Sequence, residues 1–220
     1  MVTAAMVACL VIPGGPKMAS MQMKKRDFLL GTGFVGMAGL AGIPSVIAAE
    51  QNVNRSSSVF NVFDFGAKGD GKTPDSEGIQ KALDAAGQVN GTVYFPAGKY
   101  LCHDLKVHAH TTLLAEPQWG YRGDAGAMLL LDSEEADCLL NITGAFGVHL
   151  RGLFLQGRRE AKKAIHGVFL NNAEKYSPQE DAIVIDDCKI ERFSGHGVHL
   201  LRIWLFIIRH SIMQGNKGCG

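Results

Sequence analysis

The segment "FDFGAKGDGKTPDSEGIQKALDAAG", residues 63–87, decides how this chain is interpreted. Within it, Gly66–Thr73 has the spacing G-x-x-x-x-G-K-T, which is the pattern of a phosphate-binding loop. In such a loop the backbone N–H groups and the ammonium of Lys72 would bind phosphate, and the hydroxyl of Thr73 would bind Mg²⁺. The apolar run "AIVIDD", residues 182–187, ends in carboxylates like the metal-holding strand of nucleotide-binding proteins. Nucleotide binding is therefore the first hypothesis to examine.

The sequence around the loop favours another fold. A phosphate-binding loop follows a buried parallel strand in a chain where strands and helices alternate. Here the preceding run, residues 59–66, alternates apolar and polar residues. One helix is predicted, over residues 73–87, with Thr73 as its N-cap and Gly87 at its end. Because only short apolar runs follow, the sequence predicts an all-β fold in which Lys72 is solvated and no nucleotide is bound.

The C-terminal part contains a repeat that is typical of stacked coils. A shift of twenty-three positions places Ile183–Ile185 over Phe206–Ile208 and Gly195 over Gly218. A β-solenoid needs such apolar ladders, because each coil buries its inward side chains only by stacking on the next coil.

Together with "GTVYFPAGKYL", residues 91–101, the opening segment resembles the N-terminal region of the pectate-lyase-like superfamily, in its rhamnogalacturonase/epimerase-like branch. That family has an aspartate, then G-A-x-G-D-G-x-T-D-D, a short helix, and the strand pair G-G-x-V-x-F-P-x-G-x-Y. Pro74 and Asn90 depart from this pattern. The resemblance implies a right-handed parallel β-helix over residues 59–220 with a short N-terminal capping helix. The matching residues are Asp64, Gly66, Ala67, Gly69, Asp70, Gly71, Thr73, Asp75, Val93, Phe95, Pro96, Gly98 and Tyr100.

Residues 1–49 are interpreted as an export signal with an upstream extension, and residues 50–58 as a flexible leader. Basic residues 24–26 precede a long uncharged run that ends in small residues. "KKRDFLLG" resembles the twin-arginine signal with Lys25 in place of the first arginine, so the general secretory route stays open. We expect a secreted or periplasmic protein after cleavage, which would touch a membrane only through an uncleaved signal. We also expect the β-helix domain, residues 59–220, to continue beyond Gly220.

Composition excludes some classes of partner and leaves the cysteines open. The chain has 46% hydrophobic and 20% charged residues and a net charge of +1, so we expect a folded protein without a nucleic-acid partner. The cysteines after the signal have no metal-like spacing. They are interpreted as buried core residues, with disulfides as the alternative: Cys102, Cys138, Cys188 and Cys219.

Candidate substrate-binding residues are Asp186, Asp187, Lys189 and His196. The first three, with the neighbouring charges, could form an outward cluster for acid/base hydrolysis or β-elimination, or they could be solvated turn residues. The "GHG" around His196 is similar to a polygalacturonase motif, but the two aspartates lie less than a coil upstream. His196 is therefore expected to be a turn residue. We expect the catalytic residues beyond Gly220, and no metal or cofactor unless a lyase uses Ca²⁺.

The resemblance implies an exported, polysaccharide-active β-helix, a glycosidase or lyase acting on pectin-like acidic glycans. We expect the 220-residue chain to be inactive by itself. The alternative is a non-catalytic β-helix that binds glycans or serves as a cell-surface structural module. A groove with clustered carboxylates would favour the enzyme, and a flat or aromatic-lined face would favour the binding module.

Overall fold

The computed structural model describes residues 58–122, 124–172 and 182–218. All of them lie in one compact unit, Asn52–Gly220. The predicted export signal and residues 50–57 of the leader lie outside the described residues. Within the described part, no helix is long and apolar enough to cross a membrane.

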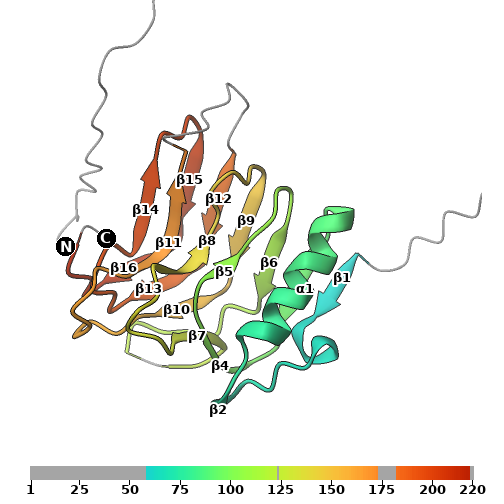
Figure 1. The fold of residues 1–220 in the computed structure, drawn as a ribbon, viewed down its shortest axis with the longest axis horizontal. Coiled ribbons are helices and arrows are strands. Elements are labelled where there is room, and N and C mark those ends of the chain that lie inside the picture. Colours follow the sequence, from blue (N-terminus) through green and yellow to red (C-terminus); the bar gives the residue numbers. More distant parts are fainter. Residues whose placement is uncertain (1–57, 123, 173–181, 219–220) are drawn as a thin grey trace, which may run out of the picture. The chain divides into compact units, whose positions relative to one another are not determined.

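The strands form three parallel sheets, to which successive coils contribute one strand in turn (Figure 1). Sheet A contains β1 (Val59–Asn61), β3 (Thr92–Phe95), β6 (Thr112–Ala115), β9 (Val148–Arg151), β12 (Ile183–Asp186) and β15 (Phe206–Arg209). Sheet B contains β2 (Asp70–Pro74), β4 (Gly98–Cys102), β7 (Ala127–Leu131), β10 (Phe154–Gln156), β13 (Lys189–Glu191) and β16 (Ile212–Gln214). Sheet C contains β5 (Leu105–Lys106), β8 (Cys138–Asn141), β11 (His166–Asn171) and β14 (Val198–Leu201). The prediction of an all-β parallel β-helix is confirmed.

Apolar ladders run through the interior because equivalent strands pair in register. In sheet A the interior ladder from β3 to β15 consists of Val93, Leu113, Leu150, Ile185 and Ile208, one from each strand. The first four of these side chains are at most 1% exposed. The predicted alignment of residues 183–185 with residues 206–208 is confirmed by the pairing of β12 with β15.

Helix α1 (Ser76–Val89) follows β2 and covers the interior at the first coil, beside β1 (Figure 1). Its buried stripe is Ile79, Ala82, Leu83 and Ala86, all 0% exposed. These side chains close the core where no earlier coil stacks.

Both predicted helix ends were wrong. Thr73 lies in β2, which pairs with β4, so the helix begins only after Asp75. It continues past Gly87 to Val89 and ends at Asn90, whose φ of 54° is left-handed. Gly87 has a packing role instead, since a Cβ there would lie 2.7 Å from the His108 side chain.

Candidate functional site

The loop at Gly66–Thr73 is closed by carboxylates of its own chain. Asp70 accepts hydrogen bonds from the backbone N–H groups of Lys72 and Thr73, both at 2.8 Å. Buried Asp75 accepts from the N–H groups of Lys68 and Gly69, at 2.6 and 3.2 Å. These are donors that a phosphate would need, and the Lys72 side chain is exposed as expected. The geometry is therefore that of a turn leading into a capping helix.

The predicted site residues are distributed over three parts of the β-helix. Asp186 ends β12 in sheet A, and Asp187 forms the turn that follows. Lys189 begins β13 in sheet B, and His196 precedes β14 in sheet C. These four residues therefore do not converge on one site.

Lys189 is buried, so its interpretation as an outward or solvated charge was wrong. Its side chain is 2% exposed, and its ammonium lies 4.3 Å from the centre of the Phe154 ring. The ammonium is 3.4 Å from a carboxylate oxygen of Glu191 and 3.6 Å from one of Asp124. Asp124 belongs to the connection between β6 and β7, whose Trp119 indole also donates to a backbone carbonyl in the turn after β12. This ion pair holds a long connection against sheet B.

Asp186 lies beside a shallow groove on the outer face of sheet A and is already paired. Its carboxylate accepts from Arg209 at 2.8 Å and from His210 at 3.0 Å. These two hydrogen bonds, Arg209 first, lower the pKa of Asp186 to about 2. The groove has a volume of about 360 Å³ and is also lined by Arg151 and Val184.

The residues near Asp186 do not fit Ca²⁺. Ligand atoms of Asp186, Asp187 and His210 lie within 4.8 Å of one another. Ca²⁺ takes six to eight oxygen ligands, whereas this group includes an imidazole, and both Asp186 oxygens already accept hydrogen bonds. The group is better described as a structural ion-pair cluster.

His196 belongs to a group of stacked rings at sheet C. Its ring lies 5.2 Å from that of His166, with 9° between the planes, and 5.2 Å from that of His199. Phe169 completes the group, with its ring stacked 5.3 Å from His199 and 5.5 Å from His166. All four residues are partly exposed. His196 is therefore a turn residue, as expected, but one that belongs to a ring cluster.

The pairing of sheet C extends this cluster into an outward row. Lys106, Asn141, Phe169 and His199 occupy matching positions on four successive strands. Because neighbouring strands lie about 4.8 Å apart, the row presents one polar or aromatic side chain per coil. Sheet C therefore has an outer face with a cation, an amide and ring surfaces in line.

Two residues of this face, His166 and His199, have lowered pKa values. Burial, and then the neighbouring His199 and His196, lower the pKa of His166 to about 4. Burial and His196 likewise lower the pKa of His199. Both imidazoles are therefore neutral at pH 7.

Sequence reasoning missed His166, Phe169 and His199. A usable signal was present, because "HGV" occurs at residues 166–168 and again at residues 196–198. The repeat places two histidines at equivalent positions of neighbouring coils.

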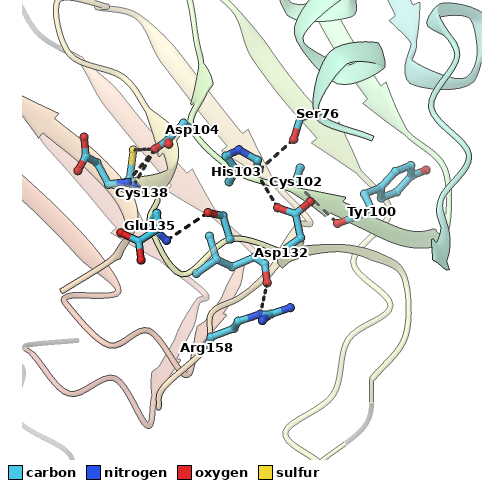
Figure 2. Close-up of polar contacts among 12 residues, drawn as sticks. Ser76, Tyr100, Cys102, His103, Asp104, Asp132, Glu135, Cys138 and Arg158 are labelled. Carbon is cyan, nitrogen blue, oxygen red and sulfur yellow. Dashed lines mark hydrogen bonds and ion pairs between the residues drawn. The ribbon is translucent and has the colours of Figure 1, made fainter. Parts of the chain in front are cut away.

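Turns beside sheet C are fixed by side chains that link one coil to the next (Figure 2). His103 contacts Asp132 at 2.7 Å, and Asp104 accepts from the backbone N–H of Cys138 at 3.1 Å. Arg158 donates to the carbonyl of Leu131 at 3.0 Å. The three described cysteines Cys102, Cys138 and Cys188 are free and buried, as expected of core residues, and Cys219 lies outside the described residues.

The chain is similar to known polysaccharide-modifying proteins. The family model described as "Rhamnogalacturonase A/epimerase, pectate lyase-like" matches residues 59–120. Alginate lyase 7 of Azotobacter vinelandii is 62% identical over 42 residues, which are 19% of this chain and 5% of the relative. Mannuronan C5-epimerase AlgE1 of the same organism is 30% identical over 159 residues, 66% of this chain and 11% of the relative. The chain thus spans a small part of these relatives.

A solved structure agrees with the sequence matches. The A-module of Azotobacter vinelandii mannuronan C-5 epimerase AlgE4 superposes with a TM-score of 0.55 at 25% identity, over 71% of this chain and 45% of that one. The coil geometry and the family match point to the same assignment. Over residues 59–120 the chain matches the rhamnogalacturonase/epimerase-like branch of the pectate-lyase-like superfamily, and the AlgE4 A-module has a similar fold.

Proposed function

We propose that this β-helix binds an anionic polysaccharide along the outer face of sheet C and modifies its uronate residues. The observation that carries the proposal is the outward row of Lys106, Asn141, Phe169 and His199, flanked by His166 and His196. Ring faces pack against the apolar faces of sugars, while the ammonium and the amide bind carboxylates and hydroxyls. The names of the matched relatives, an alginate lyase and a mannuronan C5-epimerase, agree with an acidic glycan as substrate.

The chemistry that we propose begins with removal of the uronate C5 proton. Elimination and C5 inversion share this step, and each needs a positioned base. His199 is the candidate base, because its imidazole is neutral at pH 7 and, within the described residues, makes ring contacts but no hydrogen bond. Glycoside hydrolysis instead needs a pair of carboxylates, and none of the described residues in the outward row is a carboxylate. This argues against the glycosidase that the resemblance also allowed and leaves a lyase or epimerase as the enzyme candidates. Because rings and not carboxylates line the face, the non-catalytic glycan-binding module is the second candidate function.

We further propose that the protein is exported and meets its glycan outside the cytoplasm. The basis for export is the sequence of residues 24–49 alone. N-terminal sequencing of secreted protein should find a mature chain that begins near Glu50. An intact residue 23–49 segment in a membrane fraction would contradict cleavage.

The test follows proton exchange at C5. Polymannuronate and polygalacturonate are incubated in D₂O with this chain and with a version extended by the following coils, and deuterium at C5 is measured by NMR. With the extended protein we expect either deuterium at C5, which shows C5 inversion, or a 4,5-unsaturated uronate that absorbs in the ultraviolet, which shows elimination. Either signal should be lost in His199→Ala, while the control His149→Ala, on the outer face of sheet A, keeps it. New reducing ends together with the ultraviolet absorbance of a 4,5-unsaturated uronate would identify a lyase, whereas new reducing ends with neither this absorbance nor exchange would identify a glycosidase. Binding without either reaction would favour the non-catalytic module.

A further inference from the structure

We propose that His166 is a hydrogen-bond donor of the sheet C face whose tautomer is fixed by the main chain of the next coil. This inference rests on the proposed function for its ligand, a carboxylate or hydroxyl oxygen of the bound glycan. The N–H of His196 donates to Nδ1 of His166 at 3.0 Å. With Nδ1 as the acceptor, the single proton of the neutral imidazole resides on Nε2.

The residues around the His166 imidazole leave little room for another ring orientation. The ring lies between the stacked rings of His196 and Phe169. Gly195 packs closely against the same ring, because a Cβ at this position would be 2.7 Å from Nδ1 of His166. Flipping the ring would replace Nδ1 by a carbon and leave the His196 N–H without its acceptor. The folded backbone therefore selects the tautomer.

The fixed tautomer gives His166 and His199 different roles. Nδ1 of His166 is occupied, so His166 cannot act as a base, and its Nε2–H has no acceptor among the described residues. A half-buried N–H of this kind needs an oxygen partner, which a bound glycan would supply. Burial keeps the ring uncharged at pH 7 by lowering its pKa. His166 thus binds a ligand oxygen through a directional hydrogen bond, whereas Lys106 binds it through the charge of its ammonium group.

The same hydrogen bond argues against a zinc centre at this cluster. Ligand atoms of His166, His196 and His199 lie within 4.8 Å of one another. A metal-bound histidine normally donates its second ring N–H to an acceptor, but here the second nitrogen of His166 faces an N–H donor. We therefore infer that His166 belongs to a ring cluster that holds no metal, and that its own proton resides on Nε2.

The tautomer can be measured without any substrate. Two-bond ¹H–¹⁵N correlation spectra of protein labelled with ¹⁵N-histidine distinguish the two neutral forms. At pH 7 we expect His166 in the Nε2–H form, unchanged by one equivalent of Zn²⁺. A proton on Nδ1, or stoichiometric Zn²⁺ binding that shifts His166, His196 and His199 together, would overturn the inference.

The donor role is measured by calorimetric binding of oligomannuronate and oligogalacturonate. His166→Phe keeps a ring in the stack but removes the donor, and should weaken binding roughly tenfold. His166→Gln restores a donor and should recover part of the affinity, while His149→Phe, outside sheet C, should have no effect. Each variant is checked for an unchanged Tm.

Two results separate failure of this inference from failure of the proposed function. If His166→Phe binds like the wild type while Phe169→Ala is weakened, the donor role is wrong but the sheet C face still binds glycan. If neither substitution changes binding, the proposed glycan face itself is wrong, and this inference falls with it.

Discussion

The imidazole of His166 stacks on that of His196, thirty positions later in the chain, at a centroid distance of 5.2 Å. Both residues precede a glycine and a valine, and β11, which begins at His166, pairs in parallel with β14, which follows His196. The register in which neighbouring coils pair therefore aligns these two rings, just as it aligns the apolar ladders of the core. The same register that builds the fold also aligns the candidate site.

The phosphate-loop pattern should have no nucleotide-binding consequence. We expect Lys72→Ala to leave the free energy of unfolding nearly unchanged, because the side chain is exposed. Ile79→Asp should cause a large loss of stability, since it places a charge at a position that is 0% exposed. Urea unfolding measures both effects. Calorimetric titration with Mg²⁺-ATP should show no binding, and micromolar affinity lost in Lys72→Ala would refute the turn interpretation.

Two glycines with the same backbone angle should respond differently to alanine. Gly152 and Gly144 both have φ of 75°. A Cβ at Gly152 would lie 2.0 Å from the carbonyl oxygen of Ala115, whereas no atom lies within 4 Å at Gly144. Gly144→Ala should therefore cost only the left-handed strain of about 1–2 kcal/mol. Gly152→Ala should cost at least about 1–3 kcal/mol more, as measured by urea unfolding, and equal losses would contradict the close approach of the two coils.

The buried ion pair of Lys189 should be strongly coupled to its partner. Lys189→Met leaves Glu191 buried without its cation, so we expect a loss of about 3–5 kcal/mol. The double substitution with Glu191→Gln should recover much of this loss, because Gln156 and Gln214 can still hydrogen-bond the new amide. A double-mutant cycle by urea unfolding measures the coupling.

Lys163 offers the matched exposed control for this experiment. Its side chain is 41% exposed and pairs with Asp137, which is 78% exposed. Lys163→Met should cost far less stability than Lys189→Met, because an exposed ion pair contributes little. If Lys189→Met costs equally little, the burial of Lys189 under the β6–β7 connection is wrong.

Asp186 should make stability fall in acid. Its folded-state pKa of about 2 lies below its ordinary value of 3.8, chiefly because of the hydrogen bond from Arg209. The native state therefore favours the ionised carboxylate, and this contribution is complete above pH 3.8 and is lost as the pH falls toward 2. We expect the stability difference between the wild type and Asp186→Asn to be constant at neutral pH and to shrink over this range. A difference that does not change between pH 5 and pH 2 would exclude the pairing.

The sequence by itself determined the fold class and its first coil. The apolar runs are short and follow one helix, so the all-β solenoid could be predicted from the local pattern of apolar residues. The same pattern predicted the buried stripe of helix α1 that begins at Ile79. The ladder from Ile183–Ile185 to Phe206–Ile208 was also visible, because that coil has a regular length. These features depend on neighbours in sequence or on one constant period.

Only the tertiary structure decided which polar residues share a face. Contacts between equivalent positions span 35 residues from Gln156 to Glu191 but 23 from Glu191 to Gln214. Because the turns differ in length, no constant period in the sequence places His166 beside His196, or the β6–β7 connection over Lys189. The physical reason is that parallel backbone pairing fixes the register of each coil, while turn residues are added or removed without disturbing it.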